Sequence, residues 1–124
     1  MEQLTVALIA PAANPVAVTV SGPTRLAILQ SLVGGDIERV ILSEVAEDAG
    51  FDFYANEEGK LEGMPGNLNL GYDVVVGNVI VARNDAEGNT TSIEPGDLVK
   101  IESLIAGKNL QGRPIQRVRK DWGL

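Results

Sequence analysis

Short aliphatic runs that alternate with polar residues open the chain and predict strands. The apolar run Leu4–Ala10 ends at Pro11, and Val16, Val18 and Val20 then recur at every second position. A period of two is typical of a strand with one face turned inward, and proline stops a strand because it has no N–H for the ladder. We therefore expect two neighbouring strands joined by a turn.

Four further segments have the composition of strands, at residues 37–43, 51–56, 74–82 and 90–93. The stretch 74–82, VVVGNVIVA, is the most strand-like of them, and we expect it to lie at the centre of the sheet. Gly77 within it is typical of a bulge or of a close approach of another backbone. The turn RNDAEGN that follows predicts a hairpin, because Asp and Asn bond back to the turn backbone and Gly takes a positive φ.

Two segments carry apolar residues at helical spacing. The first follows the start signal at residues 21–24 and ends at Gly34, and the second begins near Asp97 and ends at Gly107. Glycine ends a helix because it adopts the left-handed conformation without strain, and an acidic residue in the first turn favours the helix dipole. The apolar positions are Leu26, Ile28, Leu29, Leu32 and Val33 in the first segment and Leu98, Ile101, Leu104 and Ile105 in the second.

Together these elements predict one α+β domain over residues 1–110, with a mostly antiparallel sheet and two short amphipathic helices. The 124 residues are the length of a single domain, and no internal repeat is present. Residues 111–124 follow the last apolar periodicity, and we interpret them as a basic C-terminal tail.

The chain contains neither cysteine nor histidine. This excludes disulfides, thiol nucleophiles, histidine-ligated metals and Ser-His-Asp triads. The turn at residues 83–89 is a poor calcium loop because Arg83 would take the first ligand position. We therefore predict a protein that is not an enzyme and that holds no cofactor and no metal.

A carboxylate-dependent enzyme is kept as an alternative, because acidic residues crowd the middle of the chain. Paired carboxylates can hydrolyse glycosides when one is protonated and the other is ionised. A solvated acidic face explains the same cluster without any chemistry. The residues are Glu44, Glu47, Asp48, Asp52, Glu57, Glu58 and Glu62.

The net charge is −7, and it is unevenly distributed. Residues 1–110 hold 6 basic and 16 acidic side chains, whereas the tail holds Arg113, Arg117, Arg119 and Lys120 against Asp121. The acidic body argues against direct binding of nucleic acid. The tail is either a solvated extension or an arm that reaches for an anion.

No apolar run approaches the roughly 20 residues that cross a bilayer. The apolar opening of the chain lacks a basic leader and is broken by Pro11, so it does not resemble a signal peptide. We expect a cytoplasmic protein without a membrane partner.

Glycine-rich turns beside strand ends are the candidate ligand-binding elements. Successive backbone N–H groups in such turns can bind an anion, and asparagine side chains add donors. Arginine supplies the charge-assisted bonds that a small phosphorylated ligand needs. Ordinary structural turns are the alternative explanation. The candidate residues are Gly34, Gly35, Asn67, Asn69, Arg113, Arg117 and Arg119.

Five short motifs carry a family resemblance. They contain Gly34, Gly35, Ile37 and Glu38; Asn56, Glu57, Gly59, Lys60 and Leu61; Pro65 and Asn67; Asp73, Val74 and Gly77; and Asp85 and Gly88. Through them the chain resembles a small family known as domain of unknown function number three thousand eight hundred and forty-six, over roughly residues 4 to 105. Leu70 departs from the small residue that is commoner there, and the basic tail lies outside the shared region.

The resemblance implies an accessory protein of a phage, plasmid or other mobile element, acting in the host cytosol. Such proteins often counter host immunity. One hypothesis is a binding protein that sequesters a cyclic or otherwise phosphorylated nucleotide signal; the alternative is an acidic inhibitor that binds a host protein or mimics DNA. We also expect a homo-oligomer, because small domains gain core by self-association and strand edges need covering.

Overall fold

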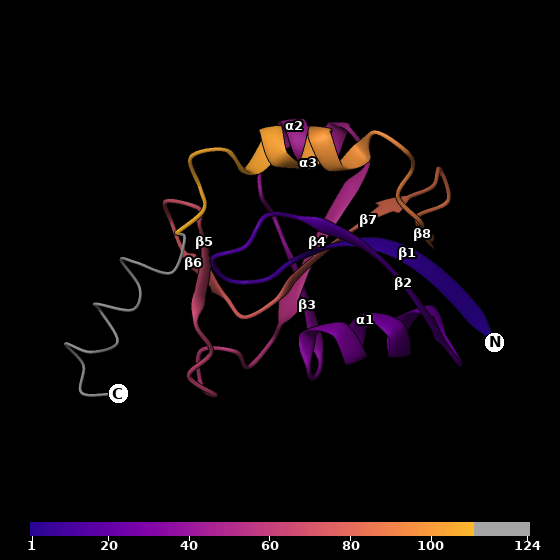
Figure 1. Ribbon diagram of the computed structural model, residues 1–124, viewed down its shortest axis with the longest axis horizontal. Helices are drawn as coiled ribbons and strands as arrows, with labels where there is room; N and C mark the ends of the chain where they lie inside the picture. Colours follow the sequence, from indigo (N-terminus) through magenta and orange to yellow (C-terminus); the bar gives the residue numbers. More distant parts are fainter. Residues whose placement is uncertain (111–124) are drawn as a thin grey trace.

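The computed structural model describes residues 1–110, which form two antiparallel sheets and three helices (Figure 1). The larger sheet has six strands in the order β2-β1-β7-β4-β3, with β8 paired to β7, and the smaller one pairs β5 with β6. The strands are β1 (Glu2–Ile9), β2 (Val16–Gly22), β3 (Ile37–Val40), β4 (Phe51–Asn56), β5 (Gly66–Asn69), β6 (Val74–Val76), β7 (Val79–Asn84) and β8 (Thr90–Thr91). The prediction of a mostly antiparallel α+β fold is confirmed.

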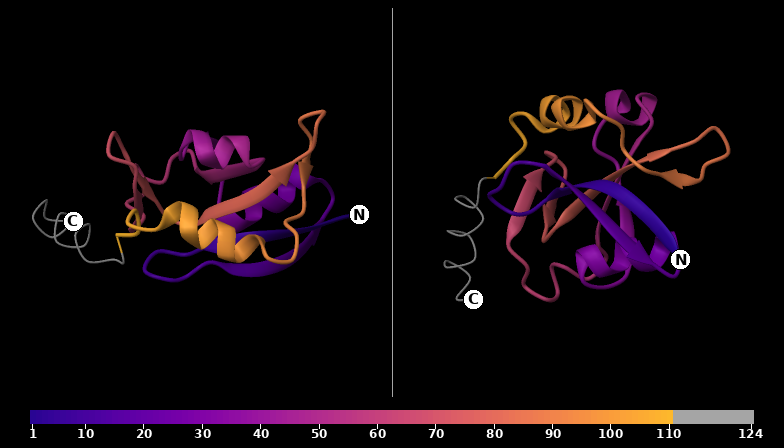
Figure 2. Two further views of the ribbon diagram at one scale, coloured as in Figure 1. Left: turned by 90° about the horizontal axis from the view of Figure 1, so that it is seen from above. Right: turned by 45° about the vertical axis from the view of Figure 1, so that its right-hand side comes forward.

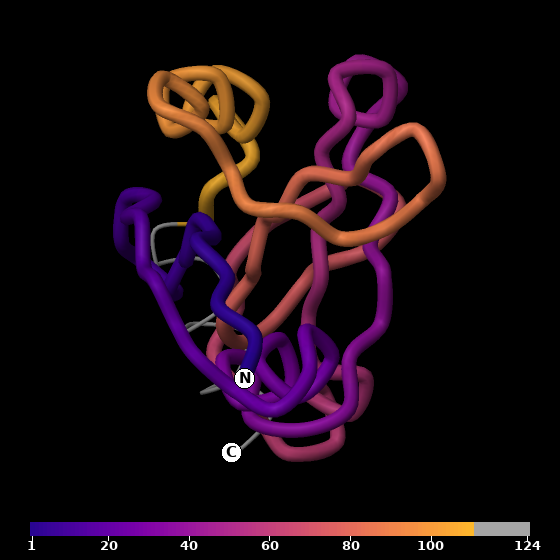
Figure 3. Tube along the Cα trace, turned by 90° about the vertical axis from the view of Figure 1, so that its right-hand side faces the viewer, coloured from indigo at the N-terminus to yellow at the C-terminus, as the bar shows by residue number. Residues whose placement is uncertain are grey.

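The helices cover the two faces of the large sheet. They are α1 (Arg25–Val33), α2 (Glu44–Asp48) and α3 (Asp97–Ile105). Figures 2 and 3 show α1 on one side of the sheet and α2 with α3 on the other. No helix in the described part of the chain is long and apolar enough to cross a membrane.

Each face of the sheet has its own apolar core, and β1 contributes to both because its side chains alternate. Leu4 and Val6 pack with Ile28 of α1, whereas Ala7 and Ile9 belong to the core on the side of α2 and α3. Successive side chains of a strand point to opposite faces, so a strand between two covered faces reads as one continuous apolar run. This is why the opening segment is apolar at nearly every position.

Both expected helices form, and α1 begins and ends at its capping residues. Thr24 precedes α1, and its hydroxyl accepts a hydrogen bond from the N–H of Ala27 at 3.0 Å. Gly34 ends α1 with a φ of 81°, as predicted. The short helix α2 was not expected: the Ser43 hydroxyl accepts from the N–H of Ala46 and turns the acidic segment into one helical turn and a half.

The expectation of a single central strand over residues 74–82 is wrong. The segment divides at Gly77 into β6, in the small sheet, and β7, in the middle of the large one. Gly77 has a φ of +76°, and a Cβ there would lie 2.7 Å from Sδ of Met64. Only glycine combines this backbone with this approach, so the chain changes sheet at this residue.

The predicted strand at 51–56 is confirmed as β4, whereas two other predicted strands are shorter. The segment expected at 37–43 ends as a strand at Val40, and the one at 90–93 is reduced to the two residues of β8. The turn between β7 and β8 is the predicted hairpin, in which the Asp85 carboxylate accepts from the N–H groups of Glu87 and Asn89. Strand β5 is not predicted by the sequence pattern, because its residues lie in a glycine-rich segment without alternation.

Candidate functional site

The predicted glycine donors are already used within the fold. The N–H groups of Gly34 and Gly35 both donate to the carbonyl of Gln30, at 2.9 and 3.1 Å, and so close the end of α1. A Cβ at Gly35 would lie 3.0 Å from Nδ2 of Asn56, so this glycine also allows a close packing contact. Neither amide is therefore available to an anion in this conformation.

The two candidate asparagines also have partners in the fold. Asn67 is 2% exposed, and its Nδ2 donates to the carbonyls of Ile9 and Gly77, both at 2.7 Å. Asn69 is exposed, and its Oδ1 accepts from the N–H of Gly71 at 2.9 Å. Asn67 thus fastens the small sheet to the large one, and Asn69 shapes a turn.

The three candidate arginines, Arg113, Arg117 and Arg119, lie outside the described residues. The structure therefore does not bring the predicted ligand-binding set together within residues 1–110. The anion hypothesis now depends on the arginines and on the side-chain N–H groups of Asn69, because the glycine and Asn67 donors already have internal partners.

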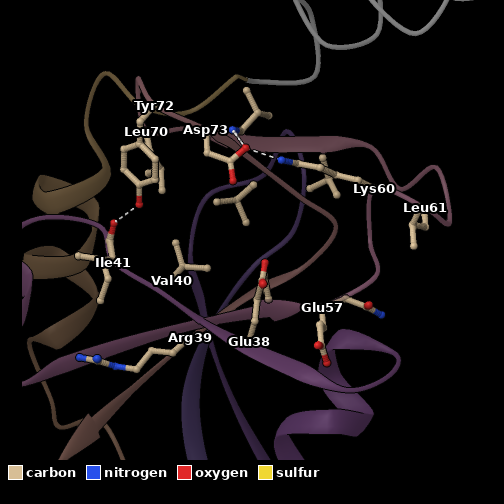
Figure 4. Close-up of a pocket in the computed structure, with 15 residues that line it drawn as sticks. Glu38, Arg39, Val40, Ile41, Glu57, Lys60, Leu61, Leu70, Tyr72 and Asp73 are labelled. Carbon is tan, nitrogen blue, oxygen red and sulfur yellow. Dashed lines mark hydrogen bonds and ion pairs between the residues drawn. The ribbon is translucent and has the colours of Figure 1, made fainter.

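A groove with a volume of about 420 Å³ lies between β3 and β6 (Figure 4). Its floor is the core, where Val40, Ala55 and Val75 are buried. Its other lining residues are Glu38, Arg39, Ile41, Asn56, Glu57, Lys60, Leu61, Leu70, Tyr72, Asp73, Val74 and Val76. The two strands belong to different sheets, and in the part of the chain that the structure describes each is paired on one side only, β3 with β4 and β6 with β5. The groove therefore separates two open strand edges.

The edge of β3 presents backbone groups to this groove. In an antiparallel pair, residues alternate between those whose N–H and C=O face the partner strand and those whose groups face away. Next to β3, the N–H of Glu57 donates to the carbonyl of Asp36 at 2.8 Å. This bond shows that the backbone groups of Asp36 face the partner strand, and those of every second residue after it do the same. The N–H and C=O of Arg39 and Ile41 therefore point away from β4. The Ile41 carbonyl accordingly accepts from the hydroxyl of Tyr72, across the groove, at 2.7 Å.

Two contacts hold the far wall of the groove in place. Lys60 forms an ion pair and hydrogen bond with Asp73, and the Asp73 carboxylate also accepts from the N–H of Val74. The hydrogen bond from Lys60 lowers the pKa of Asp73 below its usual value. Both side chains are about half exposed, so this pair orients the loop more than it stabilises the fold.

Exposed acidic and large apolar side chains lie around the apolar floor of the groove. Glu38 and Glu57 are exposed and form no ion pair within residues 1–110. Leu61 is 88% exposed and Tyr72 73% exposed, and Ile41 is half exposed. Exposed large apolar side chains that gather around one concavity are typical of an interaction site.

Cations in the described part of the chain are mostly engaged with carboxylates. Arg39 lines the groove but bonds to Asp52 and Glu47. Burial lowers the pKa of Arg39, but these two carboxylates more than offset it and the net shift is upward. The groove lining therefore holds three carboxylates, from Glu38, Glu57 and Asp73, against the two paired cations Arg39 and Lys60, and this small acidic excess favours a cationic ligand over a phosphorylated one.

Comparison with known families decides the family of this chain. The model described as Domain of unknown function (DUF3846) matches residues 4–106. The chain belongs to the DUF3846 family. Neither the curated proteins nor the solved structures include a match to it.

Residues on which the DUF3846 resemblance rests gather at the groove. Those in its lining are Glu38, Asn56, Glu57, Lys60, Leu61, Asp73 and Val74. They come from three separate motifs, and the fold places them around one concavity. Other residues of the DUF3846 motifs have structural roles, because Gly34, Gly35, Asn67 and Gly77 shape turns or join the sheets.

Sequence reasoning missed the rim of the groove. Tyr72 lies between Gly71 and Asp73, in a segment with no strand or helix periodicity. A tyrosine in such a loop has no core to pack into, and this was the available signal. Ile41 gave no signal of its own, because it read as one more apolar position of a strand.

Proposed function

We propose that this protein is a binding protein that takes an extended, basic segment of a protein partner into the groove between β3 and β6. The observation that carries the proposal is the edge of β3, which has no further strand partner within residues 1–110, beside Glu38 and Glu57, which form no ion pair in the same residues. An added strand gains main-chain hydrogen bonds from such an edge, and its alternate side chains provide specificity.

The shape of the groove supports an extended occupant. Outward N–H and C=O groups occur at every second residue, at Ile37 and Arg39 within β3, and an added peptide strand pairs with groups at this spacing. The Tyr72 hydroxyl donates a hydrogen bond to the Ile41 carbonyl, and this contact limits the pairing of a bound peptide at that end of β3. A segment of a few residues fits between this contact and the loop that carries Lys60 and Leu61.

Charge supports a basic occupant. Lys or Arg side chains on alternate positions of the partner strand would meet Glu38 and Glu57, and apolar ones would cover Leu61 and Tyr72. Complementary charge raises the association rate and excludes acidic competitors. The proposal agrees with the expected acidic inhibitor class. In the phage or plasmid setting that the resemblance implies, the partner would be a host defence protein.

The test of this proposal is a charge reversal at Glu38. The probe is a synthetic peptide of about eight residues that alternates Lys with Val or Thr, and the readout is the shift of backbone amide signals in NMR titration. We expect shifts at β3 and β6, and an affinity about tenfold weaker in Glu38→Lys because the carboxylate becomes an opposing cation. Glu102→Lys is the matched control, since Glu102 is exposed on α3 and makes the same charge change.

Outcomes of this titration separate the function classes. Equal affinity in Glu38→Lys and Glu102→Lys would show that only net charge attracts the peptide, and the groove proposal would be wrong. Stronger binding of an otherwise identical peptide with Glu in place of Lys would also overturn it.

A phosphorylated small molecule stays a prediction that rests on Arg113, Arg117 and Arg119. In a thermal-shift screen, a cyclic nucleotide that binds the folded state alone raises its melting temperature. Changing the three arginines to glutamine is expected to weaken that binding by about 1–3 kcal/mol per lost charged hydrogen bond. No shift with any nucleotide in the wild-type chain would remove this hypothesis and leave the protein-binding one.

A further inference from the structure

The hairpin of β1 and β2 differs from the rest of the chain in charge. No charged residue occurs between Glu2 and Arg25, although 22% of the whole chain is charged. Strand β2 lies at one edge of the large sheet, opposite the edge formed by β3. Its register with β1 runs over seven consecutive pairs without a bulge. An edge of this length usually carries Lys, Pro or a bulge that blocks further pairing, and β2 has none of them.

Hydrogen bonds of β1 reveal which groups of β2 face outward. The N–H of Thr5 donates to Oγ of Ser92 at 2.9 Å, and its carbonyl accepts from the N–H of Ile93 at 2.9 Å. These groups therefore point away from β2, and Thr5 with Thr19 forms a non-hydrogen-bonded pair. Their hydroxyl oxygens are 2.8 Å apart, as the close spacing of such a pair allows. The N–H and C=O of Thr19 consequently point to the open edge.

By the same alternation, the backbone groups of Ala17 and Ser21 also face outward. We propose that β2 pairs with β2 of a second copy of this chain, antiparallel and about a two-fold axis at Thr19. Thr19 then lies opposite Thr19 of the other copy, and Ala17 lies opposite Ser21. Each of these pairs exchanges both of its N–H···O bonds, so every outward group between Ala17 and Ser21 gains a partner.

Electrostatics favours a second copy as the occupant of this edge. Each chain carries a net charge of −7, so two copies repel one another over most of their surface. The β1–β2 hairpin has no charged residue between Glu2 and Arg25, so pairing two chains through β2 keeps their charged residues apart. The side chains are self-complementary as well, because Val18 comes to lie beside Val20 of the other copy. The groove at β3 stays open in such a dimer, so this inference does not depend on the proposed function.

The first test compares Thr19→Pro with Thr19→Ala. Proline at position 19 removes an N–H that β1 does not use, and its ring blocks the edge. Thr19→Ala keeps the N–H and loses only the hydroxyl contact with Thr5. By light scattering from micromolar to submillimolar concentration, the wild-type chain and Thr19→Ala are expected to reach twice the 13.1 kDa of one chain. Thr19→Pro, with folding verified by circular dichroism, is expected to require at least about tenfold higher concentration.

A second test uses the two-fold axis and does not depend on proline. Because residue 19 lies opposite itself, Thr19→Lys alone and Thr19→Glu alone place like charges together and weaken the dimer. An equal mixture of the two variants places Lys opposite Glu and is expected to restore dimers that contain one chain of each. A mixture that stays monomeric while the wild type dimerises would exclude this register. A wild-type mass of one chain throughout the range, or an unchanged dimer in folded Thr19→Pro, would exclude the interface itself.

Discussion

Replacing Asp97 by alanine is expected to lower the free energy of unfolding by about 2–4 kcal/mol. The Asp97 side chain is 1% exposed, and its carboxylate accepts from Nε and Nη2 of Arg83 at 2.7 and 2.9 Å. It also accepts from the N–H of Glu94 at 2.7 Å. Removing it leaves these donors without a partner, while the Arg83 guanidinium stays over the Phe51 ring at 4.8 Å. Chemical denaturation of the variant and the wild type measures the difference.

Glu94→Gln is the matched control for this ion pair. Glu94 approaches the same guanidinium, at 3.8 Å from Nε, but its side chain is 69% exposed. Exposed pairs contribute about 0–1 kcal/mol, so the control should unfold close to the wild type. If both variants lose the same free energy of unfolding, the total negative charge around Arg83 stabilises the fold, and the bidentate contact with Asp97 does not.

The same residue predicts a pH dependence with a definite sign. The hydrogen bonds from Arg83 lower the pKa of Asp97 below its usual value, so the folded state holds its proton less tightly than the unfolded state does. Its contribution is complete above the unfolded pKa of about 3.9 and is lost as the pH falls through the lower folded value. When the pH is lowered from neutral to this acidic range, the free energy of unfolding should therefore decrease less in Asp97→Asn than in the wild type.

Asp97 also illustrates how far sequence reasoning reaches. Its place in the first turn of a helix was predicted from the periodicity of the apolar residues around it, and α3 does begin there. Its pairing with Arg83 is not predicted by the sequence, because that arginine lies in a hairpin turn 14 residues earlier in the chain. Local spacing predicts the elements, but the partner of a charged side chain depends on how β7 and α3 pack.

The groove was missed for a related reason. Its two walls come from β3 and β6, and β6 was read as part of one long strand with β7. The apolar residues before and after Gly77 have the same strand-like pattern, so the pattern does not show that the segment divides. The division depends on the positive φ of Gly77 and on its close approach to Met64. Without this division the second sheet does not exist, and no concavity forms between the two edges.

The short elements depended on side-chain contacts that have no periodicity. Helix α2 has five residues, and its start relies on one bond from the Ser43 hydroxyl. Strand β5 contains a register shift between Gly66 and Leu68, which hides its alternation. Sequence patterns need about two turns of helix or four regular strand residues to be recognised, and neither element provides them.

Replacing Asn67 by alanine is expected to lower the free energy of unfolding by about 2–3 kcal/mol. Its Nδ2 is the donor that satisfies the carbonyls of Ile9 at the end of β1 and Gly77 between β6 and β7. Alanine leaves both acceptors buried without this donor, and the small sheet loses its buried hydrogen bond to the end of β1 in the large one. Asn69→Ala is the control, because Asn69 is exposed and shapes only a local turn, so its loss should be below about 1 kcal/mol.

This comparison also decides between two roles for Asn67. If its amide served a ligand, alanine would weaken binding and leave the melting temperature of the free protein unchanged. If it joins the two sheets, the free protein melts earlier, and amide exchange quickens first in β5 and β6, whose pairing forms one wall of the groove. We expect the second result, since both N–H groups of this amide already have partners at 2.7 Å. Peptide binding would then weaken in Asn67→Ala through the displaced wall and remain unchanged in Asn69→Ala.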